Sequence, residues 1–222
     1  KMAEIVKRSS EKAAAVIVMV EAAAKILTEV YDVNPDNIVA IPHGVPDIPF
    51  GGEDHFKQEL GLSGWNLVSS FGLMSRSKGY DTAIEAMAQV VKEFPRTKLL
   101  LIGETHPVVR RKEGEVYRES LQTKAKQLGI SDHVLFVNRY LSIEDLIEYL
   151  RATDIYITPY PNLLQVSSGT LSYALSAGKA CISTPYVYAK EVLKEGRGIL
   201  VEKENPAQLA EEISGLLKDP VR

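Results

Sequence analysis

Small and hydroxyl-bearing side chains gather between residues 165 and 178, where the pattern predicts the end of a strand, a loop and the start of a helix. Ser167 and Ser168 are typical N-cap residues, Gly169 follows them, and Gly178 is a typical helix stop. A helix start attracts anions, because its free N–H groups and the helix dipole both face the ligand. The segment therefore predicts an anion-binding helix start; the alternative is an ordinary capped turn.

Other polar residues follow the neighbouring predicted strands, and ligands in parallel sheets sit outside the carboxyl ends of the strands. Cations, a histidine and glycines should therefore share one rim with the helix start. Pro107 biases the residue before it towards an extended backbone, which aims the His106 side chain. This rim predicts a polyanion site, most simply for phosphate. Its candidate residues are Gly72, Arg76, Lys78, Gly103, His106, Arg139, Tyr140, Gln165, Ser167, Ser168, Gly169 and Thr170.

Several other kinds of site are excluded by spacing. The run 72–79 does not fit the G-x-G-x-x-G of a dinucleotide site, and the G-x-x-x-x-G-K-[ST] of P-loop ATPases is absent. The predicted strand ends carry no aspartate cluster, as a phosphoacceptor receiver domain would need. The 4 histidines lack paired ligand spacing, so we expect no structural metal.

The composition is that of a globular protein, with 222 residues, 45% apolar, 25% charged and a formal charge of −3. This balance argues against nonspecific nucleic-acid binding. Cys181 is the single cysteine and has no internal disulfide partner, which favours a reducing compartment such as the cytoplasm. The apolar run 13–20 is too short to span a bilayer.

Strand and helix patterns alternate along most of the chain. This alternation predicts an α/β fold, a Rossmann-like parallel sheet with helices on both faces. The run 42–52 is rich in Pro and Gly and predicts an interdomain linker. Strands are expected at 13–20, 37–41, 67–71, 98–102, 134–137, 155–157, 180–183 and 198–201. Helices are expected around 1–12, 23–30, 56–60, 83–94, 117–128, 143–150, 169–177, 189–193 and 209–217.

An ordered set of short motifs resembles one known family. The set is Ile41-Pro42-His43-Gly44-Val45, Phe71-Gly72 through Lys78-Gly79, Leu101-Ile102-Gly103, the loop from Gln165, and Ala177-Gly178-Lys179-Ala180 followed by Thr184-Pro185. Together these motifs resemble the retaining glycosyltransferases of family 4, and within them the bacterial mannosyltransferase-like subgroup. The resemblance covers essentially the whole chain.

The resemblance implies the GT-B fold, in which two Rossmann-like domains face each other across a cleft. Residues 53–222 look like its C-terminal domain, which binds the nucleotide-sugar donor. Residues 45–52 look like the Pro/Gly linker, and residues 1–44 like a remnant of the N-terminal, acceptor-binding domain. The family's C-terminal helix, which crosses back after Asp219-Pro220, looks missing. The resemblance therefore implies an enzyme fragment that folds but is inactive alone.

Two departures from the family pattern concern the donor. The family has glutamates at the positions of Gln165 and Tyr173, which typically meet the donor sugar and the ribose. It also tends to have an arginine where this chain has Leu73, whereas Lys78 matches the family's lysine and Arg76 lies close enough to substitute for the arginine. The resemblance makes Lys78, Arg76 and Gln165 the catalytic candidates.

The same resemblance assigns the other candidates. Ser167, Ser168, Gly169 and Thr170 would donate to phosphate or sugar oxygens, and Tyr173 would orient the ribose. Arg139 and Tyr140 would lie at the edge of the base.

The expected function is transfer of a sugar, with mannose a candidate, from a nucleotide diphosphate sugar with retention. No obligatory metal is expected, because Lys and Arg can take its place. The acceptor would be a glycan or a lipid-linked molecule in cytoplasmic polysaccharide biosynthesis, and peripheral membrane association of a longer parent stays open. The alternatives are a sugar-nucleotide epimerase or glycan phosphorylase of the same fold, or a non-catalytic nucleotide-binding module.

Overall fold

The computed structural model describes residues 2–219 and contains two parallel sheets in that range. The larger sheet has the strand order β5-β4-β3-β6-β7-β8, and every neighbouring pair is parallel. This arrangement confirms the predicted α/β class. Its strands are β3 (Asn66–Phe71), β4 (Thr97–Ile102), β5 (Val134–Val137), β6 (Ile155–Thr158), β7 (Ala180–Ser183) and β8 (Ile199–Leu200).

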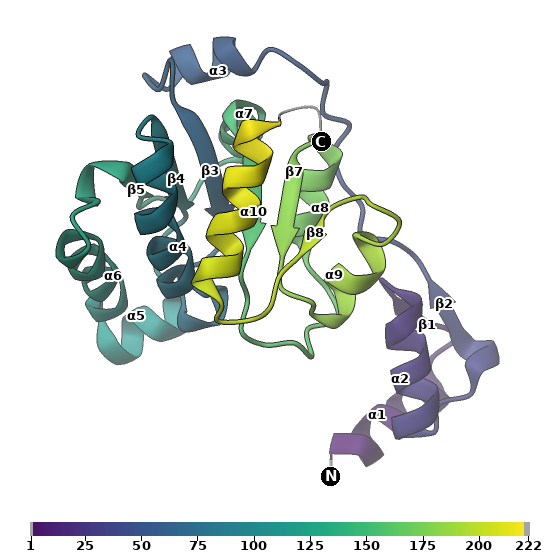
Figure 1. Ribbon diagram of the computed structural model, residues 1–222. Coiled ribbons are helices and arrows are strands. Elements are labelled where there is room, and N and C mark those ends of the chain that lie inside the picture. Colours follow the sequence, from purple (N-terminus) through teal and green to yellow (C-terminus); the bar gives the residue numbers. More distant parts are fainter. Residues whose placement is uncertain (1, 220–222) are drawn as a thin grey trace.

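Helices cover both faces of this sheet, because successive residues of each buried strand point to opposite sides. Val68 and Leu99 pack on one side with α4 (Tyr80–Glu93), α6 (Val116–Gln127) and α10 (Pro206–Lys218). Figure 1 shows α10 crossing in front of the sheet beside α4. The opposite side carries α3 (Glu53–Glu59), α7 (Ile143–Ala152), α8 (Gly169–Ser176) and α9 (Val187–Val192).

The N-terminal part forms a separate two-stranded sheet, at the lower right of Figure 1. Its strands are β1 (Val16–Val18) and β2 (Ile38–Ala40), flanked by α1 (Met2–Lys12), α2 (Glu21–Tyr31) and the short turn η1 (Pro35–Asn37). The Glu191 carboxylate on α9 accepts hydrogen bonds from the amides of Glu21 and Ala22, at 2.8 and 2.9 Å. These two hydrogen bonds tie the start of α2 to α9, which packs on the six-stranded sheet.

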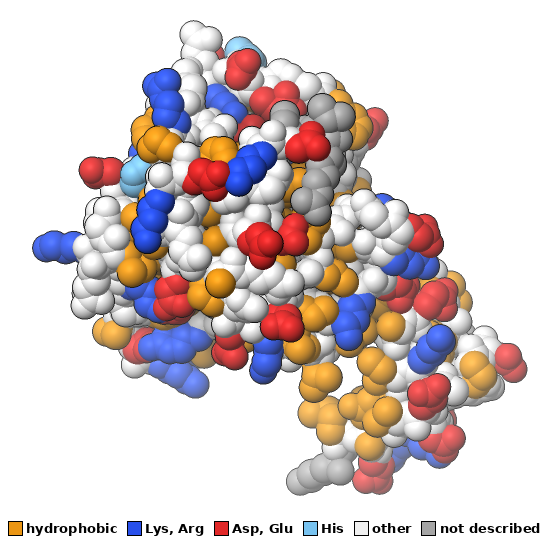
Figure 2. Space-filling model, viewed as in Figure 1, with side chains coloured by type: hydrophobic (Ala, Val, Ile, Leu, Met, Phe, Trp, Pro, Cys, Tyr) orange, Lys and Arg blue, Asp and Glu red, His pale blue; other side chains and the backbone are white. Residues whose placement is uncertain are grey.

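The prediction of a buried strand over 13–20 is wrong in length and burial. The strand is shorter, and Ile17 keeps 64% of its surface exposed, because α2 covers only one face of this small sheet. Figure 2 shows hydrophobic side chains on the surface of this part. The large exposed apolar residues there are Met2, Ile5, Ile17, Met19, Val30, Val39 and Ile41.

The segment 41–52 has no regular secondary structure, as its prolines and glycines predict, yet it is anchored. Ile48 is 3% exposed and belongs to the core cluster that contains Tyr156 and Leu171. A Cβ at Gly178 would meet the Phe50 ring at 1.8 Å, so Phe50 lies directly against the end of α8. The segment therefore holds a fixed path along α8.

One helix was not predicted. Residues 107–113 form α5 (Pro107–Glu113), which starts where the sequence indicated only an extended loop. Pro107 occupies the first turn, where its missing N–H costs nothing, and the His106 ring nitrogen accepts the Val108 amide at 3.1 Å. The β4 loop is consequently short and ends in a capped helix.

Gly79 fixes the turn between η2 (Arg76–Lys78) and α4 with a φ of 65°, and a Cβ there would lie 1.9 Å from the Pro159 carbonyl oxygen. We expect Gly79→Ala to lower the free energy of unfolding by at least about 2 kcal/mol, because strain and a backbone clash combine. Gly129→Ala is the matched control: its φ is 71° with nothing within 4 Å, so only the left-handed strain of about 1–2 kcal/mol applies. Denaturant unfolding measures both, and equal losses would contradict the clash.

Candidate functional site

The loops after β3 and β4 are bonded together at the carboxyl edge of the sheet. The Gly72 amide donates to the Ile102 carbonyl at 2.9 Å, and the Met74 amide donates to the Glu104 carbonyl at 2.8 Å. Gly103 has a φ of 129°, and a Cβ on it would lie 2.3 Å from the Gly72 oxygen. Only glycine permits this approach, so Gly72 and Gly103 form the floor of the rim.

Lys78 reaches from the β3 loop towards the start of α8. Its Nζ donates to the Tyr160 hydroxyl at 3.0 Å and lies 4.5 Å from the centre of that ring. A Cβ on Gly72 would meet Lys78 Nζ at 3.1 Å and Thr170 Cγ2 at 3.6 Å. The structure thus brings Gly72, Lys78 and Thr170 together around one point.

The start of α8 is capped by a serine and leaves backbone amides without a partner inside the helix. Ser168 is 5% exposed, and its Oγ accepts the Leu171 amide at 3.3 Å as the N-cap. Thr170 Oγ1 lies 2.9 Å from the Tyr160 hydroxyl and 3.2 Å from Ser168 Oγ. The amides of Gly169 and Thr170 come earlier than any that can bond within the helix. The helix start therefore offers two free donors, and the Thr170 side chain of this turn shares the Tyr160 hydroxyl with the Lys78 ammonium.

Burial lowers the pKa of Lys78 to about 8. Within residues 2–219, no carboxylate forms an ion pair with this ammonium. Burial also raises the pKa of its partner Tyr160 to about 12, so that hydroxyl stays neutral while Lys78 titrates. A desolvated cation without a carboxylate gains most from an incoming anion.

We expect Lys78 to make anion binding at this rim pH-dependent. The ammonium attracts an anion such as a diphosphate and the neutral amine does not, so the contribution of Lys78 to affinity should be constant well below pH 8 and fall above it. A bound anion stabilises the ammonium form of Lys78. Near pH 8 the protein should therefore take up protons when the anion binds. Calorimetry of nucleotide-sugar binding in buffers of different ionisation enthalpy measures this uptake. An affinity that is unchanged between pH 7 and 9.5 would contradict the role of Lys78.

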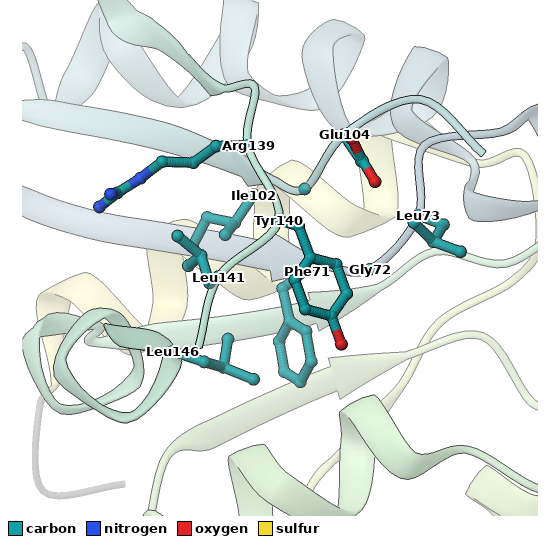
Figure 3. A pocket seen from close by; sticks show the side chains of 10 residues that line it. Phe71, Gly72, Leu73, Ile102, Glu104, Arg139, Tyr140, Leu141 and Leu146 are labelled. Carbon is teal, nitrogen blue, oxygen red and sulfur yellow. The ribbon is translucent and has the colours of Figure 1, made fainter. Parts of the chain in front are cut away.

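A cavity of about 210 Å³ opens beside this point. Its walls are mainly apolar, and Figure 3 shows the Tyr140 and Phe71 rings among the side chains that line it, with the Arg139 side chain extending in another direction. Tyr140 is 79% exposed, so its ring is available for stacking. The cavity has the size of a flat ring system and is lined by Phe71, Gly72, Leu73, Ile102, Gly103, Glu104, Arg139, Tyr140, Leu141 and Leu146.

Three predicted residues lie away from Lys78. Arg76 was expected to share the diphosphate with it, but its guanidinium pairs with Glu113 at 3.1 Å and lies over the Tyr117 ring at 4.8 Å. The His106 ring caps α5, as described above. The Arg139 guanidinium lies 3.8 Å from the Asp145 carboxylate.

The remaining candidates lie along the loop before α8 and on its first turns. Gln165 donates through its side-chain Nε2 to the Ser167 carbonyl at 2.7 Å, and its backbone carbonyl accepts the Tyr188 amide, which ties the loop to α9. Ser167 itself is exposed. The Tyr173 ring lies 6.3 Å from the rings of both His43 and Phe71. Tyr173 therefore stands between the segment 41–52 and the sheet edge.

Sequence reasoning missed two residues here, Tyr160 and His43. Tyr160 is 1% exposed and stacks on the Tyr186 ring at 5.4 Å, a contact between two loops that no local pattern signals. His43 lies in one of the motifs quoted above, but that motif does not reveal that the ring reaches Gly169.

The described residues lack both a membrane-spanning helix and a metal-binding cluster. Residues 2–219 contain no helix long and apolar enough to cross a bilayer. The same range holds no cluster of three or more His, Cys, Asp or Glu side chains arranged to bind a metal ion.

Comparison with known proteins identifies relatives over most of the chain. Residues 53–222 match the family described as "Glycosyl transferases group 1". The chain is 30% identical to a D-inositol 3-phosphate glycosyltransferase of Segniliparus rotundus, across 88% of this chain and 42% of that protein. It is 30% identical to a GDP-mannose-dependent phosphatidylinositol monomannoside mannosyltransferase of Corynebacterium glutamicum, across 65% of this chain and 36% of that protein. It thus spans about two fifths of these curated relatives.

Solved structures share the fold. The Anabaena HepE complex with UDP and glucose superposes with a TM-score of 0.82 at 20% identity, covering 98% of this chain and 57% of that one. Sucrose-phosphate synthase of Thermosynechococcus elongatus gives a TM-score of 0.79 at 23% identity, covering 98% and 52%. Because the family match extends over well more than half of the sequence, this chain belongs to the glycosyl transferases group 1 family.

Proposed function

We propose that this chain is the donor-binding part of a retaining glycosyltransferase of family 4 type. Residues 53–222 would bind a nucleotide diphosphate sugar at the rim described above, and residues 1–44 would belong to the acceptor-binding domain, with 45–52 as the linker between them. The single observation that carries the proposal is the Lys78 ammonium, which is desolvated, lacks a carboxylate partner and lies between Gly72 and the start of α8. Such an arrangement favours a ligand with a negatively charged group such as a diphosphate.

The chemistry follows from where charge develops. The bond between the anomeric carbon and the diphosphate oxygen breaks, and its electron pair stays on the diphosphate. Lys78 and the amides of Gly169 and Thr170 are fixed around that point, so they stabilise the departing charge without reorganising. The acceptor hydroxyl adds to the anomeric carbon from the face that the diphosphate leaves, and its proton passes to the leaving group. This accounts for retention without a protein nucleophile.

The other rim residues receive binding roles. The cavity beside Phe71 takes the base, with Tyr140 stacking on it. Tyr173 orients the ribose, and Gln165 hydrogen-bonds to the sugar without adding charge. Lys78 and the helix amides stand in for an obligatory metal ion in this proposal.

The acceptor side rests on the relatives. Those named above act on inositol and phosphatidylinositol mannoside substrates according to their names, which suits a glycan or lipid-linked acceptor and makes mannose a candidate sugar. We place the reaction in the cytoplasm, where the buried free thiol of Cys181 would stay reduced.

Calorimetric titration with GDP, UDP and ADP tests the proposal. At least one nucleoside diphosphate should bind much more tightly than its own nucleoside, because the rim holds the diphosphate. The panel also decides the base, since the mannosyltransferase relative is named for GDP-mannose and the HepE structure contains UDP. Failure of all three nucleotides to bind would overturn the proposal.

A further inference from the structure

His43 is held against the start of α8, although it comes from the segment 41–52 rather than from the six-stranded sheet. An ideal Cβ built on Gly169 would lie 2.9 Å from His43 Nε2 and 3.4 Å from Cε1. The imidazole also meets the Tyr173 ring edge-on, at 6.3 Å between centroids. Nε2 therefore lies next to the first residue of the helix that presents its free amides to the rim.

The other ring nitrogen fixes what Nε2 can do. Nδ1 lies 2.8 Å from the Gly44 carbonyl oxygen, which accepts hydrogen bonds only, so Nδ1 carries a proton. In the neutral ring Nε2 is then a bare acceptor, and in the protonated ring it is a donor. A single proton thus converts this nitrogen from an acceptor, which repels phosphate oxygen, into a charged donor, which attracts it.

The surroundings of His43 leave an anion as the partner that would favour the charged ring. The recorded neighbours are the Gly44 carbonyl, the Gly169 backbone and the Tyr173 phenol, and no carboxylate within residues 2–219 pairs with the ring. The charged group of the same rim is Lys78, which shares the Tyr160 hydroxyl with Thr170, the residue after Gly169. An anion bound at the helix start would therefore lie at the turn of α8 that His43 contacts and that Tyr160 links to Lys78.

We infer that His43 is a donor-binding residue, whose protonated Nε2 hydrogen-bonds to an oxygen of the bound diphosphate. This inference rests on the proposed function, because it assigns a further residue to the same site. It gives the site a second source of pH dependence, which acts in the same direction as that of Lys78, because in both cases the protonated side chain binds the anion more tightly.

The segment that carries His43 gives this role a second consequence. Ile48 is packed in the core and Phe50 lies against the end of α8, so the chain on both sides of the ring follows the helix. Donor binding would therefore fasten the segment 41–52 to the nucleotide site through one hydrogen bond.

The test is calorimetric binding of UDP-glucose and GDP-mannose between pH 5.5 and 7.5. These ligands suit the test because both their phosphates are diesters and keep a constant charge in that range. The wild-type chain should bind the recognised one about tenfold more tightly at pH 5.5 than at 7.5, as a charge-assisted hydrogen bond predicts. His43→Gln should abolish that rise, since an amide can donate a hydrogen bond but does not titrate.

His55→Ala is the matched control, because His55 is exposed and its ring contacts Phe56 on α3, outside the rim. It should keep the full pH dependence. Proton NMR of the four histidines supplies a second readout, in which the resonance lost in His43→Gln should shift towards its protonated position when ligand is added at pH 7. The inference would be overturned if the affinity of His43→Gln still increased as the pH was lowered. It would also be overturned if adding ligand did not shift the His43 resonance. If the wild-type chain binds none of GDP, UDP and ADP, the proposed function fails, and this inference with it.

Discussion

Lys78→Ala should weaken nucleoside diphosphate binding by at least about tenfold, because one charge-assisted hydrogen bond contributes about 1.5–3 kcal/mol. The affinity for the matching nucleoside should hardly change, since a nucleoside lacks the phosphates that Lys78 meets. The contrast matters because the cavity beside Phe71 is formed by other side chains. Calorimetry with the diphosphate and the nucleoside measures both, and equal losses would mean that the substitution damaged the fold.

The same residue should oppose folding in the absence of ligand. Its pKa is lowered to about 8, below the usual value for lysine, so the unfolded chain binds the proton more tightly. The contribution of Lys78 to the free energy of unfolding is therefore least favourable below pH 8. It becomes more favourable as the pH increases from about 8 towards the usual pKa of lysine. Lys78→Met, which keeps the aliphatic stem, should match or exceed the wild-type melting temperature at pH 7 while losing affinity. A marked destabilisation would make Lys78 a structural residue.

Arg76→Ala is the natural control for Lys78→Ala. The two cations are two residues apart, and from the sequence both were expected to meet the diphosphate. They lie in the tight turn η2, where three residues complete a turn, so residues two apart point in different directions. Arg76 consequently faces Glu113 and Tyr117, and its removal should leave diphosphate affinity close to wild type. A loss as large as that of Lys78→Ala would place Arg76 in the site after all.

The limits of several strands and helices could be predicted from the sequence wherever apolar and polar residues form a clear local pattern. The strands 134–137 and 180–183 were predicted to the residue, because each is a short, mainly apolar run with polar residues directly on both sides. The start of α8 was predictable for a different reason, since a serine cap followed by glycine is local chemistry. Local signals of this kind are also enough to predict the rim. In a parallel sheet the carboxyl ends of all strands lie at the same edge, so the order of the strands is not needed.

Contacts between distant segments were beyond such patterns. Tyr160 reads as one aromatic residue between two prolines, yet it is the group that binds Lys78 and Thr170. The helix α5 was missed because its residues Arg110, Arg111 and Lys112 carry charge instead of an apolar face. His43 follows a short strand of the small sheet but reaches the helix start of the large one, which only the path of the segment 41–52 decides.

Gly169→Val should abolish most nucleotide-sugar affinity, by at least about tenfold, while changing the melting temperature little. A Cβ at this position already lies 2.9 Å from His43 Nε2, and the valine methyl groups would extend further over the α8 amides. The atom in the way is the end of a side chain, so the ring can turn aside without moving backbone. The phosphate approach is then blocked and the His43 donor is displaced in the same step.

The double variant Gly169→Val with His43→Gln separates these two effects. If valine acts partly by displacing His43, the two substitutions remove one shared interaction, and the combined loss of binding free energy should be smaller than the sum of the single losses. Strict additivity would mean that valine acts by steric block alone. Nucleoside affinity is the internal control, because the base cavity does not contain Gly169. A lower melting temperature with unchanged nucleotide-sugar affinity would instead make Gly169 a turn residue with no ligand above it.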